Sequence, residues 1–258
     1  MEKSVQKLEE LYSLKGLRII VTGASGGLGL NQALMLAQCG ATVFALSRTG
    51  HAKEDLPAVL PDSLHFGVLD VRDEQDIAAC IKKIGDEGGI DVLVNNAGIT
   101  IKKRAEELTT EEWETVHQVN VTAVFNCCRY AYPYLKASGH IGRIINIASM
   151  ASSLGFSQVV PYSSSKAAVL GITRGLAVEW SADNILVNAV SPGWFPSEMS
   201  RQVMDEDRKK RILNRMPLHR FGSPDELSPI ICFLSSRAAS YITGQEFAVD
   251  GGALAYGF

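Results

Sequence analysis

The sequence lacks several features that would assign it to a membrane or nucleic-acid-binding class. No apolar run approaches the roughly 20 residues of a membrane span, and residues 1–14 are charged, without the apolar core of a signal peptide. The net charge is −3 at pH 7, so no basic field is available for nucleic acid or an anionic membrane. These absences favour a cytoplasmic protein that binds neither.

Cysteine and histidine are too scattered to build a cross-linked scaffold or a metal site. The five cysteines are odd in number, include no Cys-x-x-Cys pair and lie in apolar segments, which favours buried, reduced thiols. The five histidines show no metal-ligand spacing. We therefore expect no metal.

The chain does have the composition and the alternation of a globular α/β protein. Its 258 residues are 46% hydrophobic and 21% charged, enough to bury a core without cross-links. Short β-rich runs alternate with helical patterns, and no repeat or linker interrupts them. The strands are expected at residues 17–21, 42–47, 64–69, 92–94, 143–147, 185–190 and 246–249. This order predicts one domain over residues 1–258, a Rossmann-type doubly wound parallel sheet with helices on both faces.

A glycine-rich turn follows the first predicted strand and opens a helical pattern that ends near Cys39-Gly40. Small residues let backbone N–H groups approach a pyrophosphate, and the helix N-terminus adds partial positive charge. A plain turn is the alternative, but the strand before it and the helix after it favour nucleotide binding. The candidate residues are Gly23, Ser25, Gly26, Gly27, Leu28 and Gly29.

The second predicted strand ends in Ser47, with Arg48 after it. This is where many dinucleotide folds place an acid for the ribose 2′-hydroxyl. An arginine there can hold a 2′-phosphate and stack on adenine, which favours NADP over NAD. Alternatively, Arg48 is a solvated loop residue.

The next two strands also end in candidate ligand-binding residues, at the edge where such sheets bind ligands. Asp70 and Val71 follow the third strand, and Asp70 could contact adenine or cap the helix that follows at residues 74–84. Asn95-Asn96-Ala97-Gly98 follows the fourth strand, where the backbone could pass close to a ribose.

Tyr162 and Lys166 lie four positions apart at the start of an apolar helical pattern, so they share one helix face. A phenol has an ordinary pKa of about 10, and a neighbouring ammonium lowers it. The pair is therefore a candidate acid/base for an alcohol or ketone oxygen. The alternative is an interfacial tyrosine beside a solvated lysine.

Two further helical segments bear on the site. A capping-box pattern at residues 109–112 begins a helix predicted from Trp113 to Leu135. Asn120 inside this helix lowers its helix propensity, so we expect it to have a hydrogen-bond partner or a functional role. Residues 196–220 are polar and too long for a plain connector, with a helix-like middle from Met199 to Ile212. They predict a lid at about 194–220. Ser223-Pro224 then begins a helix over 225–234.

Taken together, these motifs resemble the short-chain dehydrogenase/reductase family in order and spacing, from about Leu14 to Gly252. The resemblance rests on the glycine motif, Asp70, the Asn95–Gly98 run, Asn120, Ser149, Tyr162-x-x-x-Lys166 and Pro192-Gly193.

The resemblance implies a nicotinamide cofactor and four catalytic residues. Tyr162 would pass a proton to or from the substrate oxygen, which Ser149 would orient. Lys166 would lower the pKa of Tyr162, helped by the oxidised nicotinamide, and would hold the nicotinamide ribose. Asn120 would hold a water near Lys166 for a proton relay.

The resemblance also completes the cofactor site. Pro192, Gly193, Phe195 and Ser197 match the segment that contacts the carboxamide. Many NADP-preferring members carry a basic residue inside the glycine motif, whereas this chain has Gly26. Arg48 is left to carry most of the 2′-phosphate contact, so NADP(H) is expected, with NAD(H) also possible.

Within the family, the chain looks most similar to the gluconate 5-dehydrogenase and deoxygluconate dehydrogenase group. The supporting features are Lys102-Lys103-Arg104, the run Asn146–Met150 and Pro192–Phe195. The basic cluster could hold a sugar-acid carboxylate, or it could be a solvated loop. The 3-oxoacyl-(acyl carrier protein) reductases are the alternative, because they share the run Asn95–Thr100 and could dock an acidic carrier on the same cluster.

A different class of function is a non-catalytic NADP-binding redox sensor. The presence of Ser149, Tyr162 and Lys166 argues against it. The resemblance further implies a homotetramer or homodimer formed through long helices. The partners expected are thus a small carbonyl or alcohol substrate and further copies of the chain.

Overall fold

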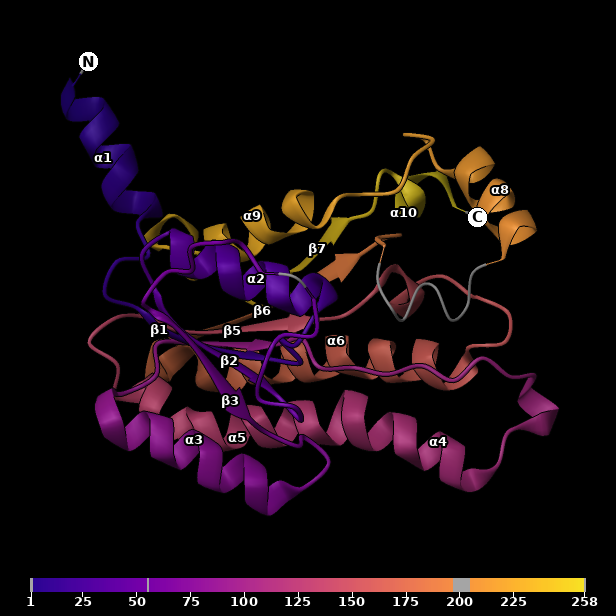
Figure 1. Ribbon diagram of the computed structural model, residues 1–258, viewed down its shortest axis with the longest axis horizontal. Helices are drawn as coiled ribbons and strands as arrows, with labels where there is room; N and C mark the ends of the chain where they lie inside the picture. Colours follow the sequence, from indigo (N-terminus) through magenta and orange to yellow (C-terminus); the bar gives the residue numbers. More distant parts are fainter. Residues whose placement is uncertain (1, 55, 197–204, 258) are drawn as a thin grey trace.

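The computed structural model describes residues 2–54, 56–196 and 205–257, which form a sheet of parallel strands between two layers of helices (Figure 1). The strand order is β3-β2-β1-β4-β5-β6-β7. From β1 the chain adds β2 and β3 on one side, and then returns to add β4 to β7 on the other side. Sheets of this kind open a crevice for ligands at such a reversal of strand order, here between β1 and β4. The predicted Rossmann-type doubly wound sheet is therefore confirmed. The strands are β1 (Arg18–Thr22), β2 (Thr42–Ser47), β3 (Leu64–Val68), β4 (Val92–Asn95), β5 (Gly142–Ile147), β6 (Ile185–Pro192) and β7 (Glu246–Val249).

Helices cover both faces of the sheet (Figure 1). Helices α2 and α9 lie on one face, and α3, α5 and α6 lie on the other. Helix α8 lies at the end of the molecule toward which the strands point. The helices are α1 (Glu2–Tyr12), α2 (Gly27–Gln38), α3 (Glu74–Gly88), α4 (Thr110–His117), α5 (Ala123–Lys136), α6 (Val160–Trp180), α8 (Glu206–Arg215), α9 (Pro224–Ser235) and α10 (Ala253–Tyr256).

The strands are apolar on both faces because each face has its own core. Successive side chains of a strand point to opposite faces. Ile19 and Val21 of β1 therefore join the core under α2 and α9, while Ile20 between them joins the core under α3, α5 and α6. Buried parallel strands of this kind have no polar face in their sequence.

The long helix predicted from Trp113 to Leu135 is present as helical backbone over residues 110–136. A π-helical turn, which sequence did not predict, spans Gln118–Thr122 and divides it into α4, which ends at His117, and α5, which begins at Ala123. The predicted capping box is present, because Glu112 N–H donates to the Thr109 hydroxyl (3.2 Å) and Thr109 N–H donates to the Glu112 carboxylate (2.9 Å).

The start of the helix-like middle predicted from Met199 to Ile212 lies outside the described residues, which omit 197–204; its described part forms α8, Glu206–Arg215. One other expectation needs correction. The five cysteines are free, but Cys39 at the end of α2 is exposed rather than buried. Among the described residues, no helix has both the length and the apolar character needed to cross a membrane.

Candidate active site

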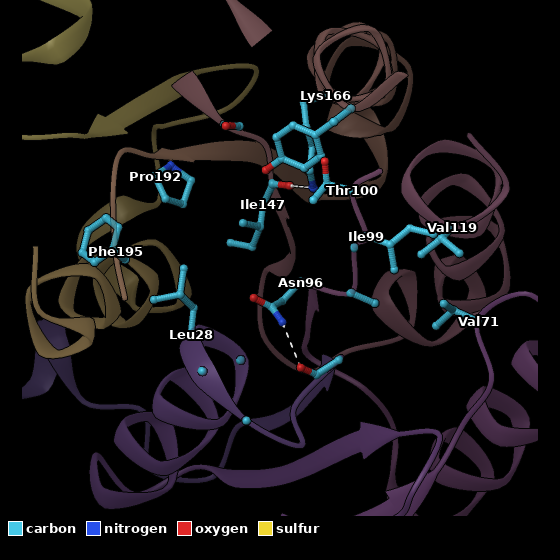
Figure 2. Close-up of a pocket in the computed structure, with 18 of the residues that line it drawn as sticks. Leu28, Val71, Asn96, Ile99, Thr100, Val119, Ile147, Lys166, Pro192 and Phe195 are labelled. Carbon is cyan, nitrogen blue, oxygen red and sulfur yellow. Dashed lines mark hydrogen bonds between the residues drawn. The ribbon is translucent and has the colours of Figure 1, made fainter. Parts of the chain in front are cut away.

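A cavity of about 930 Å³ opens at the carboxyl edge of the sheet, a size suited to a small-molecule or cofactor site. Its lining comes from the loops after six strands, α4 and the π-helical turn that follows it, the start of α6, and α8. Figure 2 shows Leu28, Asn96, Ile147, Lys166 and Pro192 around this space. Segments far apart in the sequence meet here because every strand points to the same edge.

Most of the predicted site residues line this cavity. The exceptions are Asn120, which is fully buried and does not line the cavity, and Ser197, which is outside the described residues. The lining residues that sequence predicted are Gly23, Ser25, Gly26, Gly27, Leu28, Gly29, Ser47, Arg48, Asp70, Val71, Asn96, Ala97, Gly98, Ser149, Tyr162, Lys166, Pro192, Gly193 and Phe195.

The glycine turn is closely packed against the loop after β4. Gly23 has a φ of +67°, and a Cβ at this position would lie 2.7 Å from Ala97 Cα. A Cβ at Gly29 would lie 2.3 Å from Asn96 Nδ2, which donates to the Thr22 and Gly23 carbonyl oxygens. Side chains at these two positions would push the turn away from the sheet edge.

The N-terminus of α2 presents a backbone donor to an anionic oxygen. Gly27 N–H donates to a Glu54 carboxylate oxygen at 2.8 Å, and a Cβ at Gly26 would lie 2.9 Å from that oxygen. The partial positive charge of a helix N-terminus favours such an anion. The residues present therefore fit a phosphate-bearing cofactor, whose oxygens have the same charge and need the same approach.

The ends of β2 and β3 form the polar end of the cavity. Ser47 Oγ accepts from Gly50 N–H at 3.2 Å, and the exposed Arg48 lines the same end. Asp70 pairs with Arg72 at 2.5 Å, and the hydrogen bonds from Arg72 hold the pKa of Asp70 below its usual range. The alternative that Asp70 caps α3 is wrong, since Asp73 is the cap residue.

Tyr162, Ser149 and Lys166 meet in the middle of the cavity. Lys166 is buried, and its Nζ donates to the Ile147 carbonyl oxygen at 2.6 Å (Figure 2). This Nζ lies 5.9 Å from the centre of the Tyr162 ring. Ser149 follows β5 and hydrogen-bonds to the Tyr162 side chain. Two hydroxyls can thus meet one substrate oxygen, with a buried ammonium close to the tyrosine ring.

Burial governs the pKa values of this group. It raises the pKa of Tyr162, and the hydrogen bond to Ser149 opposes the rise. It lowers the pKa of Lys166 to about 8. The lowering of the Tyr162 pKa expected from Lys166 is not seen here. That expectation also depended on the charge of the oxidised nicotinamide.

Asn120 has protein partners that explain a polar residue in this helical segment. Its Nδ2 donates to the Ile99 carbonyl and to Ser165 Oγ, both at 2.9 Å, and its Oδ1 accepts from Ile99 N–H at 2.9 Å. The side chain therefore joins the loop after β4 to α6. Asn120 Oδ1 accepts only one of these hydrogen bonds, and its second lone pair can accept from a water. The water expected near Lys166 stays a prediction.

The basic cluster predicted to hold a carboxylate does not line the cavity. Lys103 pairs with Glu112 at 3.0 Å, and Arg104 pairs with Glu106. For these two residues the solvated-loop alternative fits better. Sequence reasoning instead missed Thr100, Trp194 and Arg208, which all line the cavity. Trp194 stood in the noted Pro192–Phe195 run, but no local signal distinguished Arg208 from its charged neighbours.

Comparisons with known proteins agree with this architecture. A family model described as enoyl-(acyl carrier protein) reductase matches residues 23–253. The chain is 39% identical over 248 residues to 2-dehydro-3-deoxy-D-gluconate 5-dehydrogenase from Dickeya dadantii, covering 95% of this chain and 98% of the relative.

Two further similarities bear on substrate and cofactor. A 3-oxoacyl-(acyl carrier protein) reductase from Thermotoga maritima is 38% identical over 246 residues, covering 93% of this chain and 98% of the relative. The crystal structure of a gluconate 5-dehydrogenase from Burkholderia cenocepacia, in complex with NADP and tartrate, superposes with a TM-score of 0.86 at 30% identity. The superposition covers 96% of this chain and 99% of the Burkholderia chain.

Proposed function

Because this chain belongs to the short-chain dehydrogenase/reductase family, we propose that it interconverts a ketone and a secondary alcohol on a sugar acid, keto sugar or polyol with NADP(H). As a family member it is an oxidoreductase acting on CH–OH groups. The observation that carries the proposal is the meeting of Ser149, Tyr162 and the buried Lys166 in one cavity with the glycine turn. The relatives that act on gluconate derivatives support the substrate class.

The proposed mechanism assigns one task to each side chain. When bound, the nicotinamide supplies or accepts the hydride. Tyr162 gives its proton to the carbonyl oxygen during reduction, and its raised pKa keeps that proton available at neutral pH. Ser149 hydrogen-bonds the same oxygen and orients it. Lys166 supplies positive charge beside the phenolate that forms, and would hold the ribose of the cofactor.

Arg48 and Ser47 would bind the 2′-phosphate of NADP(H), beside the glycine turn that would hold the pyrophosphate. The exposed guanidinium of Arg48 at the polar end of the cavity supports this assignment. We also propose a homotetramer or homodimer, as is common in the family. Light scattering would test it, and a monomer would refute it.

The test is oxidation of NADPH and of NADH over 2- and 5-keto sugar acids, neutral keto sugars and acetoacetyl thioesters. We expect turnover with keto acids or sugars and faster turnover with NADPH than with NADH. Turnover confined to thioesters would instead support the second candidate function, a 3-oxoacyl reductase, which the Thermotoga relative favours. Tight NADP binding without turnover on any substrate would support a redox sensor.

A further inference from the structure

The charged side chains that line the cavity are unevenly distributed. The acidic residues Glu54 and Asp70 lie beside the glycine turn and after β3. The other end is formed by Trp194 after β6 and by Arg208 on α8. Among the described lining residues, this end contributes no carboxylate. A substrate that enters there meets positive charge that no acidic side chain of the cavity offsets.

Arg208 is held by an aromatic surface rather than by an acid. Its guanidinium carbon lies 5.8 Å from the centre of the Trp194 ring, and the Trp194 ring meets Phe156 edge-on at 5.9 Å. Within the described residues Arg208 has no ion pair; the carboxylate of nearby Asp205 accepts from its backbone N–H at 2.7 Å and attracts its charge only at longer range. A cation–π contact of this kind leaves the N–H groups of a guanidinium available for a planar anion.

Two other polar groups in the lining also lack partners. Trp194 Nε1 and Thr100 Oγ1 are buried, and neither has a hydrogen-bond partner in the described part of the chain. Buried polar groups are nearly always paired, and an indole N–H can only donate. Each of these atoms can therefore take a further partner, either a water or a ligand oxygen, in addition to the oxygen that Ser149 and Tyr162 would hold.

We propose that Arg208 binds the carboxylate of the substrate, and that the Trp194 N–H donates to another of its oxygens. The two residues would thus select a hydroxylated keto acid over a neutral ketone. This assignment rests on the proposed function, since it places the carboxylate relative to a carbonyl held by Tyr162. It replaces Lys102-Lys103-Arg104 as the acid-binding group, because none of those residues lines the cavity.

The test compares a keto sugar acid with the neutral keto sugar of the same carbon skeleton. In Arg208→Gln, the ratio of kcat/KM for the acid to kcat/KM for the sugar should fall about 10- to 100-fold, as expected for loss of a charge-assisted hydrogen bond. Most of the fall should be in KM, because the proposed contact holds the carboxylate in both the ground state and the transition state. Arg208→Lys should restore part of the ratio.

Lys210→Gln is the matched control, since it removes the same charge from an exposed residue of the same helix. Trp194→Phe keeps an aromatic surface but removes the N–H, and should raise KM for both hydroxylated substrates. Melting temperature and NADPH affinity of each variant establish that folding and cofactor binding persist.

Two results would overturn the assignment and can be told apart. A wild-type enzyme that reduces only thioesters would refute the proposed function and the carboxylate site with it. A wild-type enzyme that reduces keto acids, with an unchanged ratio in Arg208→Gln or an equal fall in Lys210→Gln, would refute the role of Arg208 alone.

Discussion

Lys166 brings a positive charge into a buried position without a carboxylate partner among the described residues. Burial lowers its pKa from 10.5 to about 8. Holding the charge inside therefore destabilises the fold below about pH 8, and this penalty disappears as the pH rises toward 10.5. A core lysine with that penalty is hard to explain by stability, which supports its proposed role beside Tyr162.

At the same scale, Tyr162→Phe tests the proton transfer. The variant keeps the ring but loses the hydroxyl, so kcat should fall about 10²- to 10⁴-fold, the usual contribution of a positioned acid or base. NADPH affinity, measured by calorimetry, should stay within about threefold of wild type, since a ring without its hydroxyl still fills the same space.

Tyr241→Phe is the control for that variant, because Tyr241 is fully exposed and does not line the cavity. It should keep wild-type kcat. Near-normal turnover in Tyr162→Phe would end the proposed mechanism.

The residues of the site differ in how well sequence could predict them. Tyr162, Lys166 and the glycines have fixed spacing within a single turn or helix, so local sequence identifies them. Arg208 and Trp194 come from separate segments, and only the packing of α8 against the loop after β6 brings them together. By contrast, the adjacent cations Lys102-Lys103-Arg104 formed a visible cluster, but nearby acids engage two of them.

Among the elements, the strands were the most predictable. The ends of all seven strands lie within about two residues of the ends predicted from their apolar β-rich runs. For example, β6 spans Ile185–Pro192, and the prediction was 185–190. The helix around Asn120 was less predictable, because its interruption depends on distant partners. Asn120 reaches Ile99 and Ser165, and a π-helical turn of the kind often found at functional sites brings it there.

Helix α9 provides a test of stability at the scale of an element. Glu226 accepts from both terminal nitrogens of Arg220 at 2.7 Å and from Ser223 N–H at 2.8 Å. The bonds from Arg220, and then that from Ser223, lower the pKa of Glu226 from 4.5 to about 2. The stability contributed by the carboxylate is present above pH 4.5 and is lost as the pH falls through about 2.

Glu226→Gln should therefore have a lower urea midpoint than wild type at pH 6, and this gap should narrow as the pH falls below 4.5. Glu179→Gln, at an exposed position of α6, is the control and should show no such gap. A gap that stays constant down to the lowest pH at which both proteins fold would contradict the prediction.

For the whole molecule, cofactor binding should raise the free energy of unfolding. NADPH at a hundredfold excess over its Kd adds about 2.7 kcal/mol, which corresponds to a rise in Tm of about 5–10 °C for a chain of this size. The Tm of wild type, measured by calorimetry, should rise more with NADPH than with NADH at equal concentration. In Arg48→Gln the two shifts should become equal.

Arg211→Gln is the control for that experiment, because Arg211 is an exposed cation that does not line the cavity. It should keep the wild-type difference between the cofactors. An Arg48→Gln protein with the full NADPH shift would remove Arg48 from the 2′-phosphate site.

The cavity takes its lining from residues as far apart as Gly23 and Arg208. During synthesis the glycine turn leaves the ribosome first, and Arg208 follows it by most of the length of the chain. A nascent chain that ends before β6 therefore has a glycine turn but no complete cavity. A ligand that needs contacts from both the glycine turn and Arg208 can therefore stabilise the chain only after most of it has been synthesised.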